Sequence, residues 1–362
     1  MRIALIGGIY GKDARYRASV LHTPETTLEA GLKKRGHSVK AFSHHADLSG
    51  QSFDVIHVHH LGYGALRAAV DTSRAAFVYT SHDGSALAGV RVPYRRHLAS
   101  RFVMARADAV VALSQAEAEF ESRRYQLSGA MHAVIPNGID TTVYSCARRR
   151  SGGSRRSWRL LFVGQLIASK NVDVLLRAIA RLRAPVELDL AYQNPALEIP
   201  LRNLAASLGL LDKVRFLGAK SPFELAGLYQ HADVFVLPSA AESLPCVIAE
   251  AMLCGTPVVA TDVGGIREQL AGYGSLVSPG NSAELAAAIG SVLDHYEWFS
   301  SLGESMSQSA RRRFSIDAMA DRHLKLYAEL LGRQGPRRRH GASAPSLGTA
   351  LTRGVRLLCA TK

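Results

Sequence analysis

The most informative segment of the chain reads Val234-Phe-Val-Leu-Pro-Ser-Ala-Ala-Glu242-Ser-Leu-Pro-Cys-Val-Ile-Ala-Glu250-Ala-Met252. Its apolar start, residues 234–237, is typical of a buried strand, and the residues from Ser243 onward are typical of a helix. Strand, short loop and helix form the repeating unit of doubly wound α/β proteins, whose ligands bind beyond the carboxyl ends of the strands. The segment therefore predicts an α/β fold with a ligand-binding loop after residue 237.

Two acidic residues lie on either side of the predicted junction between loop and helix. With a helix start near Ser243, Glu242 lies at the helix mouth and Glu250 about two turns inside, a separation of ~12 Å at the helical rise. That span suits a ligand with hydroxyl groups at both ends and a diphosphate between them, because a helix N-terminus offers free amides and partial positive charge. The alternative, that both acids are exposed helix residues, is less favoured in this strand–loop–helix context.

The same alternation extends in both directions along the chain. Short apolar runs rich in β-branched or aromatic residues predict further strands. These runs lie at residues 2–6, 39–42, 55–58, 77–80, 109–113, 133–135, 159–163, 186–190, 214–217 and 257–260. Helical stretches separate them, and the first begins with Thr23 as N-cap and Pro24 at the first helical position. Two doubly wound, Rossmann-like domains in series are the simplest architecture.

The positive charge of the chain is concentrated in two segments. The formal net charge is +14, and residues 147–159 hold six arginines while residues 333–362 hold six arginines and one lysine, with no acid in either segment. Polar, like-charged segments cannot bury a core. We therefore expect an N-terminal domain (1–146), a basic linker (147–158), a C-terminal domain (159–312), a closing helix (313–332) and a disordered basic tail (333–362). The folded body is nearly neutral, so no nucleic-acid partner is expected.

Composition excludes several classes of protein. With 47% hydrophobic and 20% charged residues, the chain is not of a disordered, collagenous or coiled-coil class. Its four cysteines form no C-x-x-C pair, which disfavours a disulfide scaffold and fits a reducing cytosol. No apolar run approaches the roughly 18 residues of a membrane span, and residues 1–8 are too short for a signal peptide. We expect a cytoplasmic protein.

Several blocks of the sequence together resemble a known family. Glu242-x7-Glu250, followed by Ala251-Met-Leu-Cys-Gly-Thr-Pro-Val-Val-Ala-Thr-Asp-Val-Gly-Gly265, resembles the signature of the retaining glycosyltransferases of family four (glycosyl transferases group 1), which have the GT-B fold. Similar blocks occur in family order at residues 54–59, 79–83, 134–140, 162–170 and 313–330, so the resemblance covers about residues 1–331. It implies two Rossmann-like domains that face each other across a cleft.

The resemblance also implies roles for single residues, with His82, Lys170 and Glu242 as the catalytic ones. Glu250 would hold the ribose hydroxyls of a nucleotide sugar, Glu242 a hydroxyl of the transferred sugar, and Lys170 the diphosphate. His82 would face the sugar from the acceptor side. Gly8 would let the backbone approach the ligand, since glycine has no side chain to obstruct it. The full implied donor-binding set is Gly8, Gly164, Gln165, Lys170, Glu242, Ser243, Leu244 and Glu250.

The sequence departs from the family pattern at two places. Gln165 stands where arginine is usual, so one positive charge near the leaving group is absent, although an amide still donates hydrogen bonds. Ala191-Tyr-Gln-Asn-Pro195 replaces the usual glycine-acid-glycine turn. No D-x-D follows a strand, so no metal and no other cofactor is expected. The implied activity is retaining, metal-independent transfer from a nucleotide sugar, with UDP ahead of GDP, to an acceptor that is a secondary metabolite, a polysaccharide or a lipid-linked glycan.

Four other interpretations of the sequence are less favoured. A nicotinamide-dependent dehydrogenase is rejected, because Gly7-Gly8-x-x-Gly11 is not G-x-G-x-x-G and no acid ends the second strand. Histidines 44, 45, 57, 59 and 60 lack the spacing of a metal site and are interpreted mainly as loop or sheet-end residues. A non-enzymatic basic module that binds nucleotides or nucleic acid has only the two charged segments in its support. Peripheral contact with the inner face of a membrane, through an arginine-rich helix near residues 91–106, is less favoured than a helix that packs its apolar stripe inward. That stripe comprises Tyr94, Leu98, Phe102 and Val103.

Overall fold

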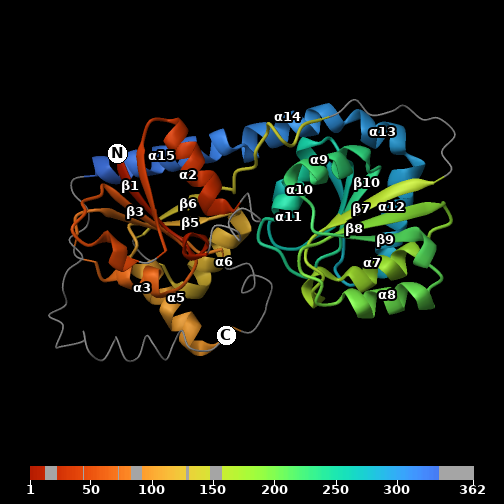
Figure 1. Cartoon of the computed structure of the whole chain (residues 1–362), viewed down its shortest axis with the longest axis horizontal. Coiled ribbons are helices and arrows are strands. Elements are labelled where there is room, and N and C mark those ends of the chain that lie inside the picture. Colours follow the sequence, from red (N-terminus) through yellow and green to blue (C-terminus); the bar gives the residue numbers. More distant parts are fainter. Residues whose placement is uncertain are drawn as a thin grey trace. The chain divides into compact units, whose positions relative to one another are not determined.

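The computed structural model describes residues 1–12, 23–43, 45–71, 73–82, 92–127, 130–146 and 157–333. The chain forms two compact units: unit 1 comprises residues 1–138 and the helix that begins at Ile316, and unit 2 comprises Ile139–Ser315. In each unit helices cover both faces of a parallel sheet (Figure 1). The interior of the predicted basic linker and the predicted tail lie outside the described residues.

Unit 1 contains a six-stranded sheet in the order β2-β1-β3-β4-β5-β6, and each neighbouring pair of strands is parallel. Its strands are β1 (Arg2–Ile6), β2 (Ser38–Phe42), β3 (Val55–His59), β4 (Ala76–Thr80), β5 (Ala109–Ala112) and β6 (Met131–Val134). Its helices are η1 (Gly8–Gly11), α2 (Pro24–Lys34), η2 (His45–Leu48), α3 (Tyr63–Ala69), α5 (Tyr94–Arg106), α6 (Gln115–Tyr125) and α15 (Ile316–Gly332). The predicted start of α2 is confirmed: Thr23 is the N-cap, and its side chain accepts from the Thr26 amide.

Unit 2 contains the second six-stranded parallel sheet, in the order β12-β11-β10-β7-β8-β9. Its strands are β7 (Trp158–Val163), β8 (Val186–Ala191), β9 (Val214–Gly218), β10 (Val234–Leu237), β11 (Val258–Thr261) and β12 (Gly274–Val277). Its helices are η3 (Ala168–Lys170), α7 (Val172–Ile179), α8 (Glu198–Ser207), η4 (Leu211–Lys213), α9 (Pro222–His231), α10 (Cys246–Leu253), α11 (Ile266–Leu270), α12 (Ser282–Asp294), α13 (Tyr296–Ser301) and α14 (Gly303–Phe314). The strand β12 was not predicted, since its sequence Gly-Ser-Leu-Val is too short and too weakly apolar to stand out.

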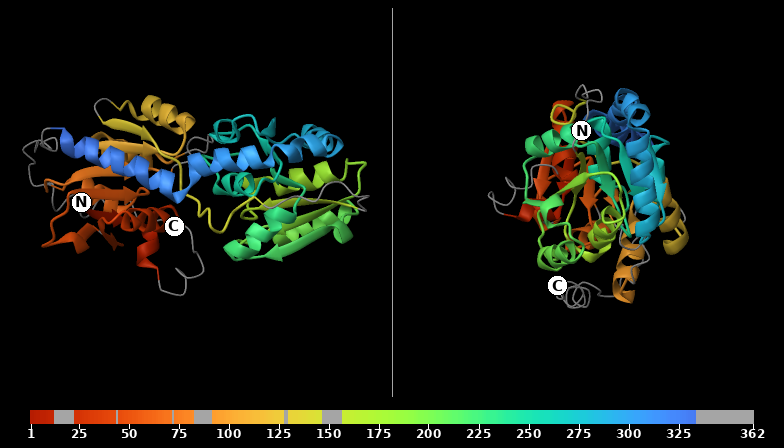
Figure 2. Two further views of the ribbon diagram at one scale, coloured as in Figure 1. Left: turned by 90° about the horizontal axis from the view of Figure 1, so that it is seen from above. Right: turned by 90° about the vertical axis from the view of Figure 1, so that its right-hand side faces the viewer.

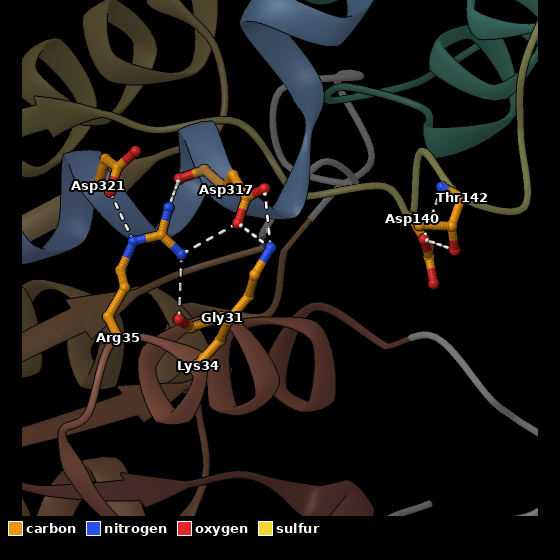
Figure 3. Close-up of polar contacts among 7 residues, drawn as sticks. All are labelled: Gly31, Lys34, Arg35, Asp140, Thr142, Asp317 and Asp321. Atoms are coloured by element: carbon orange, nitrogen blue, oxygen red, sulfur yellow. Dashed lines mark hydrogen bonds and ion pairs between the residues drawn. The ribbon is translucent and has the colours of Figure 1, made fainter.

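The chain crosses between the units at Gly138/Ile139 and returns at Ser315/Ile316. The first crossing lies ahead of the predicted boundary at residue 146, because the intervening residues pack on unit 2. There Tyr144 is buried, with its ring in edge-to-face contact with Tyr229, and Gln230 donates to the Ser145 carbonyl at 2.9 Å. Asp140, in the same segment, forms a local turn by accepting from the Thr142 amide at 2.9 Å (Figure 3).

The closing helix α15 lies along α2 of unit 1 (Figure 2). Their contact is close because Gly31 has no side chain: a Cβ there would lie 2.8 Å from the Ala320 Cβ. At the edge of the contact Arg35 Nε donates to Asp321 at 2.6 Å, and Lys34 pairs with Asp317 at 3.0 Å (Figure 3). These ion pairs are exposed and contribute little, so the apolar packing between the helices holds α15 in place.

The arginine-rich helix α5 presents a surface that differs from the prediction. Val103 is buried as expected, but Tyr94, Leu98 and Phe102 are 74%, 45% and 39% exposed. These three follow a four-residue spacing and therefore share one face of the helix. The inward apolar stripe is thus narrower than predicted. Among the described residues, no helix is both long and apolar enough to cross a membrane.

Candidate functional site

The order of strands in unit 2 places two loops side by side. The chain winds outward from β7 in one direction through β8 and β9, and from β10 in the other through β11 and β12, so the winding reverses between β7 and β10. In doubly wound sheets ligands bind at this reversal, outside the carboxyl ends of the strands. The loops after β7 and β10 are joined there by a backbone hydrogen bond from Ala240 to the Ser169 carbonyl at 2.8 Å.

These two loops bring Lys170 and Glu242 together. The Nζ atom of Lys170 donates to Glu242 Oε1, and the Ser239 hydroxyl donates to the same oxygen at 2.7 Å. The two charged side chains are only 19% and 10% exposed. A charge that is largely removed from water needs a partner, so each side chain is neutralised by the other. These are the two residues that the family resemblance assigns to the sugar and the diphosphate.

The helix after Glu242 begins later than predicted. Pro245 is the N-cap of α10, whose first residue is Cys246, so residues 242–245 are not helical and the ~12 Å estimate of helical separation does not apply. The reason is tertiary: the Ser243 carbonyl accepts from the Gly265 amide at 2.8 Å, which draws it away from a helical partner. The Ser243 hydroxyl is buried and has no hydrogen-bond partner within the described part of the chain, whereas Leu244 is buried as an anchor of the loop.

A glycine after β11 packs directly against the backbone of the loop that contains Glu242. Gly264 has φ +56°, and a Cβ built on it would lie 1.9 Å from the Glu242 carbonyl oxygen. No side chain fits there, and the left-handed conformation also disfavours one. Gly264 therefore allows the close approach of the Glu242 backbone, and the neighbouring Gly265 binds the Ser243 carbonyl. The sequence of residues 251–265 did not reveal this role.

Glu250 lies in the first turns of α10. Its Oε2 atom accepts from the Tyr229 hydroxyl at 2.9 Å. Although the residue keeps some accessible surface, burial around the carboxylate raises its pKa to about 7, against the opposing effect of the Tyr229 hydrogen bond. Tyr229 is fully buried and comes from α9, so sequence reasoning missed it.

The loop after β7 contains the first departure from the family pattern. Gly164 leaves room for the ring of Phe162, whose Cζ would lie 2.9 Å from a Cβ at this position. Gln165 is exposed. The loop is tied to the second departure, because the Leu166 amide donates to the Asn194 carbonyl at 3.0 Å. The Ala191-Tyr-Gln-Asn-Pro195 turn thus supports the backbone beside Gln165.

In unit 1 the winding reverses between β1 and β3, and glycines follow β1. A Cβ on Gly7 would lie 2.9 Å from Glu25 Cγ, whereas a Cβ on Gly8 would meet nothing within 4 Å. Gly7 is therefore required by packing. Gly8 is exposed, so the absence of a side chain there leaves its backbone accessible to a ligand and is not required by packing.

His82, the predicted residue of unit 1, belongs to a cluster of histidines that the sequence did not reveal. Its Nε2 atom lies 3.0 Å from His59 Nδ1, and its ring centroid lies 4.4 Å from that of His60. His57 is fully buried within β3 and hydrogen-bonded to Tyr327 at 2.6 Å and to Thr80 at 2.8 Å. His57 thus lies inside a strand, an exception to the interpretation of most of these histidines as loop or sheet-end residues, while His44 and the side chain of His45 lie outside the described residues.

Glu25 completes this cluster from α2. Glu25 is 3% exposed, and its carboxylate lies 3.2 Å from His60 Nε2. Burial raises the pKa of Glu25, but the pKa is lowered overall, with the hydrogen bond from His60 first among the contacts that lower it. In the chain segments that the structure describes, no group of three or more His, Cys, Asp or Glu side chains is arranged to hold a metal ion.

The structure thus groups the predicted residues within their units. Unit 2 holds the larger set, which comprises Gly164, Gln165, Lys170, Glu242, Ser243, Leu244 and Glu250. Unit 1 holds Gly8 and His82. Lys170 and Glu242 are in direct contact, and Glu250 follows on the helix that the same loop enters.

Comparison with known proteins identifies the family of both halves of the chain. The family model described as Glycosyl transferases group 1 matches residues 147–313, and that described as Glycosyltransferase Family 4 matches residues 41–143. A protein named D-inositol 3-phosphate glycosyltransferase from Salinispora arenicola is 32% identical in an alignment 321 residues long, which covers 78% of this chain and 70% of the relative.

Solved structures show the same fold. Sucrose-phosphate synthase from Thermosynechococcus elongatus superposes with a TM-score of 0.78 at 21% identity, over 91% of this chain and 99% of that one. Anabaena Alr3699/HepE in complex with UDP-glucose superposes with a TM-score of 0.69 at 21% identity, over 91% of this chain and 100% of that one. With its two parallel sheets and both family matches, the chain belongs to the group 1 glycosyltransferases of family four, and its fold is GT-B.

Proposed function

We propose that this glycosyltransferase moves a sugar from a nucleotide-diphosphate sugar, with UDP as the nucleotide, to an acceptor hydroxyl with retention of anomeric configuration and without a metal ion. The observation that supports this most is the pairing of Lys170 with Glu242 where the winding of unit 2 reverses. Glu250 follows in the next helix. UDP and UDP-glucose occupy the related Anabaena structures, which favours UDP for this chain.

The roles follow from charge. Cleavage of the bond between sugar and phosphate leaves negative charge on the nucleoside diphosphate, and preorganised donors at that position supply the main stabilisation of the transition state. Lys170 is the cation for that charge, with Gln165 and the N-terminal amides of α10 as neutral donors. Glu242 accepts from a hydroxyl of the transferred sugar, and Glu250 accepts from the ribose hydroxyls. The family resemblance also makes His82 a candidate contact of the transferred sugar.

The acceptor is the least constrained part of the proposal. Because the curated relatives are named D-inositol 3-phosphate glycosyltransferases, a phosphorylated polyol belongs in the acceptor panel, beside lipid-linked and oligosaccharide acceptors. A nucleic-acid-binding module remains the contrasting function, and its only support, the two arginine-rich segments, falls largely on residues outside the described ones.

The test is a panel of nucleotide sugars and duplex DNA added to the full-length protein. We expect one UDP-sugar to raise the melting temperature and to be hydrolysed slowly without acceptor. With an acceptor, NMR should show that the new glycosidic bond has the same anomeric configuration as the donor. Activity should persist after EDTA treatment. Stabilisation by DNA alone would contradict the enzyme, an inverted product would contradict retention, and activity that EDTA abolishes and Mn²⁺ or Mg²⁺ restores would contradict metal independence.

A further inference from the structure

The His82 ring is held on two sides by residues from the end of β3. His59 Nδ1 lies 3.0 Å from His82 Nε2, and the ring centroids of His59 and His60 lie 5.3 Å and 4.4 Å from that of His82. Both His60 (φ 64°) and His82 (φ 51°) have left-handed backbones, which non-glycine residues rarely adopt. Such strain persists only where the surroundings over-determine the conformation, as at functional sites.

The hydrogen bond between His59 and His82 has a direction that the surroundings decide. Burial lowers the pKa of His59 to about 3 and that of His82 well below its ordinary value, so both rings are neutral near pH 7 and each has one ring proton. Either His59 Nδ1–H donates to His82 Nε2, or His82 Nε2–H donates to His59 Nδ1. In the second arrangement the remaining proton of His59 lies on its Nε2.

The Nε2 atom of His59 is buried and has no hydrogen-bond partner within the described part of the chain. A proton there would be a buried N–H without an acceptor, which native structures almost never contain. The first arrangement leaves a lone pair unsatisfied instead, which is tolerated more often. His59 is therefore the donor, and the proton of His82 lies on Nδ1.

The His59 ring is itself held in place by the ring of His57. It stacks on His57 with centroids 4.5 Å apart, and both nitrogens of His57 are hydrogen-bonded, to Tyr327 of α15 and to Thr80 of β4. His57 is 0% exposed. A chain of contacts thus runs from the closing helix through β3 to His82, and a turn of the His57 ring would break two buried hydrogen bonds.

We propose that His59 is a positioning residue that fixes His82 as the Nδ1–H tautomer, so that His82 offers Nδ1–H as a donor to a hydroxyl oxygen of the transferred sugar. The contact with the sugar rests on the proposed function, whereas the tautomer does not. His82 keeps accessible surface, as a group that meets a ligand must. Partners that set the tautomer and orientation of a functional histidine are as important as the ring they hold.

The tautomer can be measured without any substrate. Long-range ¹H–¹⁵N spectra of the ¹⁵N-histidine-labelled full-length protein at pH 7 distinguish the two tautomers, with His82→Gln used to assign the His82 signals. We expect His82 to be protonated on Nδ1 and His59 on Nδ1. A wild-type spectrum with the His82 proton on Nε2 would overturn the proposal, and this result does not depend on any His59 variant folding.

The functional half is tested by two substitutions of His59. His59→Leu removes the donor, and we expect His82 to populate the Nε2–H tautomer and kcat to fall about tenfold with little change in donor KM, the effect of one lost hydrogen bond. His59→Asn places an amide N–H near the former Nδ1 and should restore both the tautomer and most of kcat. Equal kcat in His59→Leu and wild type would overturn the positioning role. A chain with the expected tautomer that transfers no sugar would contradict the proposed function alone.

Discussion

Lys170 and Glu242, which come from the loops after β7 and β10, form an ion pair in which Glu242 Oε1 also accepts from Ser239. The family resemblance assigns these two side chains to different parts of the donor, the diphosphate and the sugar. Under the proposed function, a bound diphosphate would compete with Glu242 for the ammonium group of Lys170, and substitution of Lys170 measures what this cation contributes.

Lys170→Ala should lower kcat by ~100–1,000-fold, because the loss of one preorganised donor to a developing charge commonly costs ~2.7–4 kcal/mol.

Gln165→Arg, which restores the guanidinium usual in the family, should raise donor affinity, since its planar fork suits phosphate. In the double variant arginine should recover part of the lost rate, because both groups address the same oxygens. Transfer kinetics of all four proteins measure this cycle, with Lys213→Ala, an exposed lysine of the same unit, as the control. Strictly additive effects would show that Gln165 does not face the diphosphate.

Glu250→Gln should raise the donor KM and remove a pH dependence. The folded protein raises the pKa of this carboxyl group from 4.5 to about 7. Between these two pH values the group is therefore protonated in the folded protein without donor and ionised in the unfolded chain. Its contribution to stability is therefore full below about 4.5 and is lost as the pH rises to about 7. Ribose hydroxyls prefer the ionised carboxylate as acceptor, so donor affinity should rise with pH up to about 7 and then level off.

Calorimetric titration of UDP from pH 5.5 to 8.5 tests this dependence. The phosphate of UDP titrates in the same range, but it does so equally in wild type and in Glu250→Gln, so the difference between the two curves isolates Glu250. Glu297→Gln, an exposed acid on α13, serves as the matched control. Parallel curves for wild type and Glu250→Gln would remove Glu250 from the donor site.

Tyr229→Phe should shift the midpoint of this pH dependence to a higher pH. The Tyr229 hydroxyl donates to Glu250 Oε2 at 2.9 Å, and this hydrogen bond favours the ionised carboxylate. Without it the midpoint should lie above 7, and donor affinity at pH 7 should fall by about tenfold, the effect of ~1.5 kcal/mol for a hydrogen bond to a charged group. The same titration measures both quantities. An unchanged midpoint would mean that solvent replaces the hydroxyl fully.

Gly264→Ala should damage both folding and donor binding, whereas Gly280→Ala should only weaken folding. Both glycines have positive φ, +56° and +77°, so alanine adds backbone strain of ~1–2 kcal/mol at either position. At Gly264 the new Cβ would also lie 1.9 Å from the Glu242 carbonyl oxygen, while at Gly280 it would meet nothing within 4 Å. Urea unfolding and donor KM separate the two effects. Equal donor KM in the two variants would show that Gly264 does not set the Glu242 loop.

Much of the fold could be predicted because its signals are local. Buried parallel strands are short continuous apolar runs, such as Val234–Leu237, and helix starts depend on a few neighbouring residues, such as Thr23 and Pro24. The spacing of Glu242 and Glu250 after a strand indicated a site at the carboxyl end of the sheet by the same kind of reasoning. Each of these inferences needs only residues that lie close together in the chain.

Tertiary structure decided what depends on residues far apart in the chain. The carbonyl of Ser243 bonds to Gly265, and this contact moved the start of α10 to Cys246. Only packing could reveal that Tyr229 holds Glu250, or that Glu25, an ordinary acid in the first turn of a helix, is buried beside His60. Burial and partners across the fold set the protonation of these groups, because desolvation and hydrogen bonding depend on which atoms surround a side chain and not on its neighbours in sequence.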